Sequence, residues 1–104
     1  MTLDINRIRE DFPILKETMN GRPLVYLDSG ATTLKPQVVT DAVNYYNTKK
    51  TSNVHRGVYQ LSNDATELYE GAREKVKNLL NAKKVEEIVF TKGATQALNL
   101  VAQS

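Results

Sequence analysis

Three short segments of this sequence contain residue types that can bind or transform a ligand. The first is the junction Gly93, Ala94 and Thr95, where a strand-like run meets a helical pattern. A helix that begins there would direct free backbone N–H groups, its dipole and the Thr95 hydroxyl to one point, which favours a site for phosphate or another anion. The alternative is that Gly93 only permits the turn and that Gly93 or Thr95 caps the helix. The junction lacks the Gly-x-Gly-x-x-Gly pattern of dinucleotide-binding folds and the Gly-Lys-Ser/Thr pattern of a P-loop.

Two further segments combine polar or small residues in predicted loops. His55 and Arg56 are adjacent, and a histidine titrates near neutral pH while an arginine pairs bidentately with a carboxylate or phosphate. Ser29, Gly30 and Ala31 follow an apolar run and are small enough for a ligand to approach the backbone closely. The alternatives are a surface loop with chance neighbours for the first segment and a plain turn before a helix for the second.

The composition excludes several kinds of chemistry. The chain has 104 residues and no cysteine, so it has no disulfide, thiolate metal site or cysteine nucleophile. Its 14 Lys and Arg residues and 12 Asp and Glu residues are spread evenly, which argues against nucleic acid as a partner. No apolar run reaches the roughly 18 residues of a membrane span, and no signal-peptide pattern is present. We therefore expect a cytoplasmic protein that does not bind a membrane.

The hydrophobic pattern predicts the elements that must position these residues. Apolar residues at helical spacing predict four helices, over residues 4–11, 36–47, about 62–80, and from 94 onward. Apolar or β-branched runs predict strands at residues 24–27 and 87–91. Asn20 and Gly21 are typical of a hairpin turn, and residues 48–53 are predicted to form a loop.

Seven segments, taken in order, give the sequence a resemblance to a known family. The segments are residues 11–15, 24–32, 35–36, 53–57 (NVHRG), 69–76, 88–95 (IVFTKGAT) and 98–102. They are similar to the N-terminal part of a SufS-type cysteine desulfurase, in the class V aminotransferase family of fold type I pyridoxal-phosphate (PLP) enzymes. The series covers essentially the whole chain, and the Asn-Val-His-Arg-Gly block favours the SufS-type group.

The resemblance implies the fold class and the activity of the complete enzyme. The fold would be α/β, a partial fold type I PLP-transferase that is helix-rich with few strands. Residues 1–34 would form an N-terminal arm and a small-domain segment, and residues 35–104 would form the start of the large PLP-binding domain, both incomplete. The complete enzyme would be a homodimer that converts L-cysteine to L-alanine and passes sulfur to an acceptor protein for iron–sulfur cluster assembly.

The resemblance also implies roles for the three segments. Gly93, Ala94 and Thr95 match the turn beneath the PLP phosphate, where the N–H groups and the Thr95 hydroxyl would contact the cofactor. Five residues match positions on the substrate side or at the mouth of the pocket, the last two near the dimer interface: Ser29, Gly30, Ala31, His55 and Arg56.

The family's catalytic groups cannot be identified in this chain. The family needs a lysine that binds PLP as a Schiff base, an aspartate that faces the pyridine nitrogen and a cysteine that accepts sulfur. None of the nine lysines follows a Ser or His as in the family, and cysteine is absent. We therefore expect an inactive N-terminal fragment whose missing groups lie beyond Ser104. The alternatives are another class V PLP enzyme, such as a selenocysteine lyase, a kynureninase-like hydrolase or an aminotransferase, and a small non-catalytic helical binding module.

Overall fold

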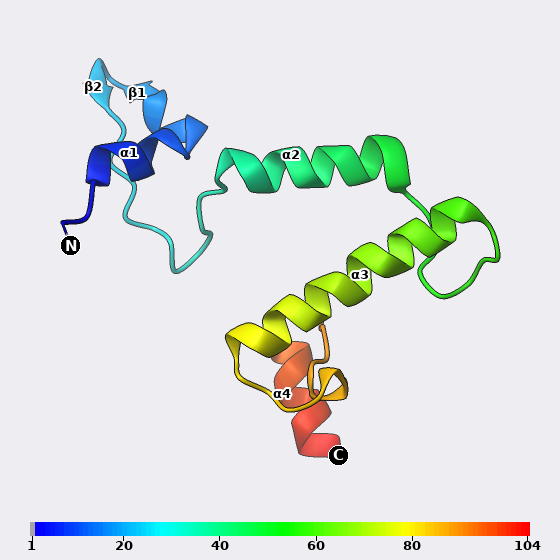
Figure 1. Ribbon diagram of the computed structural model, residues 1–104. Coiled ribbons are helices and arrows are strands. Elements are labelled where there is room, and N and C mark those ends of the chain that lie inside the picture. The colour runs from blue at the N-terminus through cyan, green and yellow to red at the C-terminus, as the bar shows by residue number, and fades with distance from the viewer. Residues whose placement is uncertain (1) are drawn as a thin grey trace. The chain divides into compact units, whose positions relative to one another are not determined.

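A computed structural model describes residues 2–104, which form two compact units that divide between Thr51 and Ser52. Figure 1 shows the helices and strands of both units. The elements of the first unit are α1 (Ile5–Glu10), the 3-10 turn η1 (Pro13–Lys16), β1 (Thr18–Met19), β2 (Arg22–Pro23), α2 (Gln37–Tyr45) and the π-helix η2 (Tyr46–Lys50). The elements of the second unit are α3 (Gln60–Leu79), the 3-10 turn η3 (Val85–Glu87) and α4 (Ala94–Gln103).

The hairpin in the first unit confirms the turn predicted from the sequence. Asn20 and Gly21 have φ angles of 53° and 73°, the left-handed conformation that both central residues of a tight hairpin turn adopt. The antiparallel strands β1 and β2 pair Met19 with Arg22 across this turn. The helix predicted just before the hairpin is also confirmed as α1, whose N-cap Asp4 accepts a hydrogen bond from the Arg7 N–H at 3.1 Å.

Both strands predicted from apolar runs are wrong. Residues 24–27 have no regular secondary structure, and Val25 and Leu27 are 75% and 92% exposed. At residues 87–91, η3 ends at Glu87 and the chain continues without regular structure to the turn before α4. A β-strand needs a neighbour to accept its backbone hydrogen bonds, and the described chain has only the short β1–β2 pair.

The loop predicted at residues 48–53 begins later than expected, because η2 continues the helical backbone to Lys50. Threonine hydroxyl groups support this wide turn. The Thr48 hydroxyl donates to the Asn44 carbonyl at 2.7 Å, and the Thr51 hydroxyl donates to the Asn47 carbonyl at 3.0 Å. These bonds satisfy carbonyl groups at a helix C-terminus, where the regular ladder ends.

The second unit is organised by α3, which begins at Gln60, two residues before the prediction. Ser62, Ala65 and Ile88 are the buried residues among those that the structure describes. Ser62 and Ala65 lie in the first turns of α3, while Ile88 follows η3, which packs against α3. The predicted helix at the end of the sequence is confirmed as α4. None of the helices described in residues 2–104 is both long and apolar enough to span a membrane.

Candidate functional site

The turn before α4 presents backbone donors that have no acceptor. Gly93 is the N-cap of α4, and no side chain accepts a hydrogen bond from the first turn of this helix. The first amide to be bonded is that of Ala97, which donates to the Gly93 carbonyl at 3.1 Å. Within residues 2–104, the N–H groups of Ala94, Thr95 and Gln96 therefore donate to nothing. Three free N–H groups at the positive end of a helix dipole attract an anion.

Side chains around this turn are held without using the free amides. The Gln96 carboxamide oxygen accepts from the Lys92 N–H at 2.7 Å, and the Thr91 hydroxyl donates to the Gly93 carbonyl at 3.1 Å. The hydroxyl of Thr95 is exposed and has no hydrogen-bond partner in the described part of the chain. Thr95 therefore does not cap the helix, and its hydroxyl is available to a ligand together with the amides.

The missing side chain of Gly93 leaves space in front of these donors. Its φ angle is 162°, an extended conformation that any residue adopts, so the backbone of the turn does not require glycine. A Cβ at Gly93 would meet no atom within 4 Å. Gly93 lines an open pocket of about 540 Å³ together with Lys92, Thr95 and Asn99 among others. Amide and hydroxyl donors around an open space fit the phosphate group of a cofactor such as PLP.

The loop that carries His55 is fixed to the first turns of α3 by two hydroxyl groups. The buried Ser62 hydroxyl accepts from the Gly57 N–H at 3.0 Å and donates to the Asn53 carbonyl at 2.7 Å. The Thr66 hydroxyl accepts from the His55 N–H at 3.0 Å and donates to the Ser62 carbonyl at 2.8 Å. Each hydroxyl both donates and accepts, so neither is left unsatisfied where it holds the loop backbone.

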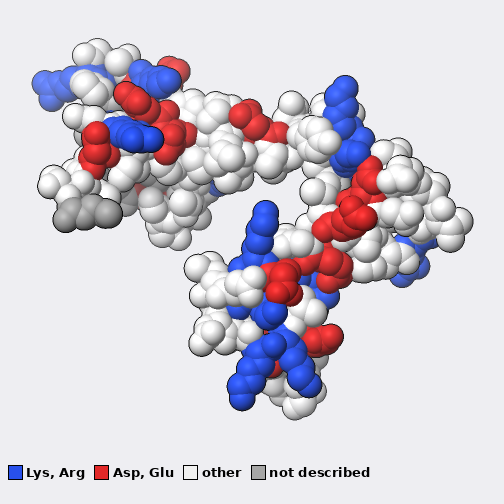
Figure 2. Space-filling view, in the orientation of Figure 1, with Lys and Arg blue, Asp and Glu red and all other residues white. Residues whose placement is uncertain are grey.

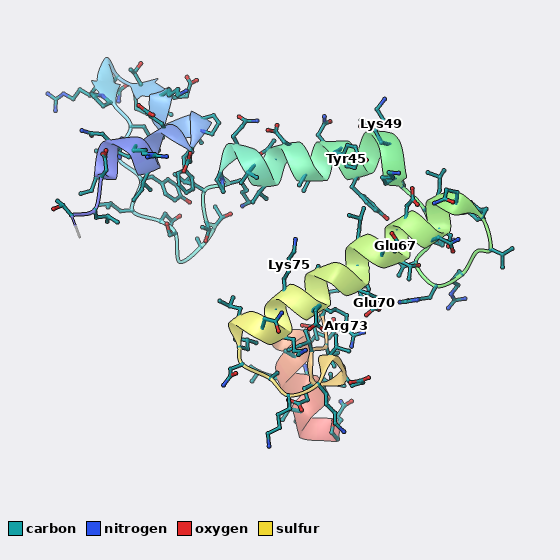
Figure 3. The ribbon with its side chains drawn as sticks, in the orientation of Figure 1. Tyr45, Lys49, Glu67, Glu70, Arg73 and Lys75 are labelled. Atoms are coloured by element: carbon teal, nitrogen blue, oxygen red, sulfur yellow. The ribbon has the colours of Figure 1, made fainter. Side chains whose placement is uncertain are left out.

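His55 has a left-handed backbone, with φ at 60°, and its side chain turns toward α3. Its Nε2 lies 2.9 Å from a carboxylate oxygen of Glu70, which Figure 3 labels on α3. The imidazole also makes an edge-to-face contact with Tyr69, at 6.1 Å between ring centroids, and Tyr69 makes a similar contact with Phe90 at 5.6 Å. Arg56 is exposed and makes no hydrogen bond or ion pair within residues 2–104. Its guanidinium is therefore available to bind a carboxylate or phosphate.

Arg73 joins α3 to the segment that leads to the Gly93 turn. Its three nitrogen atoms donate to the second carboxylate oxygen of Glu70 at 2.9 Å, to the Val85 carbonyl at 2.9 Å and to the Ile88 carbonyl at 3.1 Å. The Arg73 side chain is only 19% exposed. In Figure 2, acidic and basic side chains lie next to one another over α3, where Glu70–Arg73 is one of the ion pairs.

The sequence prediction of the site did not include Ser62, Thr66, Glu70 and Arg73. Glu70 and Arg73 stand within one of the segments that carry the family resemblance, but their spacing is that of an ordinary surface ion pair. From the sequence, Ser62 is a candidate N-cap of this helix; in the structure the N-cap is Tyr59 and Ser62 is buried in the first turn of α3. No group of three potential metal ligands comes together in the described chain.

Ser29, Gly30 and Ala31 form an exposed turn in the first compact unit, whereas the other predicted site residues belong to the second. The carbonyl of Asp28 accepts from the N–H groups of both Ala31 and Thr32 at 3.1 Å. A Cβ at Gly30 would meet nothing within 4 Å. The turn is therefore ordered by its own backbone and leaves open space around its small residues.

Replacing Gly57 with alanine is expected to destabilise the His55 loop by about 1–3 kcal/mol, because the new methyl group overpacks the site. The added Cβ would lie 2.5 Å and 2.8 Å from ring carbons of Tyr59 and 2.9 Å from the Ser62 Cβ. Urea unfolding measures the effect. Gly71→Ala in the middle of α3 is the matched control, because a Cβ there meets no atom within 4 Å and alanine favours helix by about 1 kcal/mol. Equal stability of the two variants would contradict the close packing at Gly57.

Comparisons with known proteins identify the family. The model of the family described as Aminotransferase class-V matches residues 25–104. The chain is 52% identical to a cysteine desulfurase of Synechococcus elongatus over 97% of its length, and 51% identical to a probable cysteine desulfurase of Vibrio cholerae over 100%. It covers 16% and 26% of these two relatives.

A solved structure shares the fold. The apo cysteine desulfurase of Thermococcus onnurineus NA1 matches 98% of this chain with a TM-score of 0.84 and 41% identity, and the match covers 24% of that protein. The prediction of a helix-rich part of the fold type I architecture with few strands is therefore confirmed. The chain belongs to the class V aminotransferase family.

Proposed function

We propose that these residues form the N-terminal part of a PLP-dependent cysteine desulfurase. The observation that carries the proposal is the turn before α4, where three free N–H groups, the unpartnered Thr95 hydroxyl and the open space at Gly93 form a phosphate cradle. Support also comes from sequence identity: over nearly the whole chain, about half of the residues are identical to those of proteins named as cysteine desulfurases. An anion site of this kind suits the phosphate group of PLP. When bound, the PLP cofactor would act as an electron sink.

The predicted site residues take separate roles in this proposal. Gly93, Ala94 and Thr95 hold the cofactor phosphate. Arg56, whose guanidinium has no partner in residues 2–104, binds the substrate carboxylate at the mouth of the pocket. The other residues on the substrate side are Ser29, Gly30, Ala31 and His55.

We also propose a substrate, products, a sulfur acceptor and an oligomeric state for the complete enzyme. The substrate is L-cysteine, the products are L-alanine and a persulfide, and an acceptor protein takes the sulfur for iron–sulfur cluster assembly. The complete enzyme is a cytoplasmic homodimer in which residues 1–34 belong to the small domain and residues 35–104 to the large one. Because this chain has no cysteine and no lysine in the family's context, other parts of the enzyme supply the catalytic groups, and the 104 residues alone are inactive.

The test is an assay of the complete enzyme that contains these residues. With PLP and L-cysteine, we expect L-alanine and sulfide to form in equal amounts in the presence of a thiol reductant. A turnover of L-kynurenine or L-selenocysteine, with none of L-cysteine, would favour another class V reaction. In a separate titration of the 104-residue chain, PLP should attach covalently to no single lysine. Stoichiometric attachment at one lysine would contradict the proposal that the lysine forming the Schiff base with PLP lies in another part of the enzyme.

A further inference from the structure

The carboxylate of Glu70 connects two parts of the second unit that are far apart in sequence. One oxygen lies 2.9 Å from His55 Nε2, and the other accepts from Arg73 at 2.9 Å. Arg73 in turn holds the Val85 and Ile88 carbonyls, and the chain runs from Ile88 to the turn at Gly93. Figure 3 shows Glu70 and Arg73 on α3, where this chain of contacts passes.

The contact with Glu70 determines how the His55 ring presents its nitrogen atoms. A carboxylate only accepts hydrogen bonds, so Nε2 must carry the proton that lies between the two groups. In the neutral ring, Nδ1 is then the hydrogen-bond acceptor. Within residues 2–104, Nδ1 of His55 has no partner, and the side chain is 55% exposed. The edge-to-face contact with Tyr69 further restricts the ring.

Arg73 makes the orientation of Glu70 specific. Without a second partner, a glutamate side chain on a helix surface samples several rotamers, and fixing it against one histidine opposes that entropy. The guanidinium of Arg73 is itself fixed by two backbone carbonyls at 2.9 Å and 3.1 Å. The Glu70 carboxylate is therefore pre-oriented toward His55 by groups that belong to the rigid part of the unit.

We propose that Glu70 is a positioning residue of the site, which holds His55 with a proton on Nε2 and presents Nδ1 as an acceptor to a hydrogen-bond donor on the ligand. Arg73 anchors Glu70 and ties the His55 loop to the segment that ends at the phosphate cradle. The assignment of that donor to an amino-acid substrate rests on the proposed function. The orientation of His55 does not depend on that function.

The first experiment uses NMR of the 104-residue chain with ¹⁵N-labelled histidine, which requires no cofactor. At a pH where the ring is neutral, we expect a proton signal on Nε2 and an unprotonated Nδ1. Glu70→Ala should remove the Nε2–H signal through exchange with water. Glu67→Ala is the matched control, because Glu67 is exposed one turn earlier on α3 and makes no hydrogen bond in the described chain. An Nε2–H signal that persists in Glu70→Ala, or a proton on Nδ1 in the parent chain, would overturn the proposal.

The second experiment separates positioning from stability in the complete enzyme. Glu70→Ala should lower kcat/KM by roughly 10- to 150-fold, the range expected when a hydrogen bond to a charged group is lost. Glu70→Gln keeps one oxygen that accepts from Nε2–H but turns its NH2 group toward Arg73, which is also a donor, so it should recover only part of that loss. Glu67→Ala should match the parent enzyme. A kcat/KM of Glu70→Ala equal to that of Glu67→Ala would overturn the positioning role. An inactive parent enzyme would reject the proposed function but leave the NMR result intact.

Discussion

Replacing Thr95 with valine is expected to weaken the binding of PLP to the complete enzyme by roughly 10- to 150-fold. Valine keeps the shape of the side chain but removes a hydroxyl that has no other partner in residues 2–104. A hydrogen bond to a charged group contributes roughly 1.5–3 kcal/mol, and each 1.4 kcal/mol changes the dissociation constant about tenfold. Equilibrium dialysis, followed by the fluorescence of bound PLP, measures the dissociation constant.

Two controls make the result specific for the phosphate. Thr95→Ser retains the hydroxyl and should bind PLP within about threefold of the parent enzyme. Pyridoxal, which has no phosphate, should bind equally to the parent and to Thr95→Val. If Thr95→Val binds PLP as tightly as the parent does, the hydroxyl is not a phosphate ligand. If the variant loses pyridoxal and PLP equally, the substitution has damaged the pocket rather than the cradle.

Replacing Arg73 with alanine is expected to lower the free energy of unfolding of the second unit by roughly 2–4 kcal/mol. The substitution removes three hydrogen bonds and leaves the Ile88 carbonyl without a donor, whereas the Val85 carbonyl keeps the Ile88 N–H at 3.0 Å. An unsatisfied buried group destabilises by about 1–3 kcal/mol. Urea unfolding measures the global effect. Amide hydrogen exchange at residues 85–90 measures the local effect, because this segment loses its attachment to α3.

Lys77→Ala is the matched control for Arg73. Lys77 pairs with Glu74 at 2.5 Å at the same i,i+3 spacing as Arg73 with Glu70, but within residues 2–104 its ammonium donates to no backbone carbonyl of another segment. Exposed ion pairs contribute about 0–1 kcal/mol, so Lys77→Ala should be much less destabilising. Arg73→Lys should recover only part of the loss, because a single ammonium cannot span three acceptors. An Arg73→Ala variant as stable as Lys77→Ala would contradict the anchoring role.

Local patterns in the sequence were sufficient for the helices and the hairpin turn. The apolar spacing of α3 and the pair Asn20 and Gly21 encode their conformations within a few residues, because helical hydrogen bonds and left-handed turns are local. The strands predicted at residues 24–27 and 87–91 required neighbours that the described chain does not contain. β-branched residues favour an extended backbone, but only pairing with a neighbouring strand satisfies the N–H and C=O groups of that backbone.

The sequence by itself determined which residues can form the anion cradle, because Gly93 to Thr95 are consecutive and the start of α4 places their donors together. It also placed His55 beside Arg56. Only the tertiary structure decided that Glu70 faces His55 and that Arg73 reaches Val85 and Ile88. These partners are 12 to 15 residues apart, so no helical or strand period brings them together. The path of the chain around α3 sets those distances, and a local pattern of residue types does not encode that path.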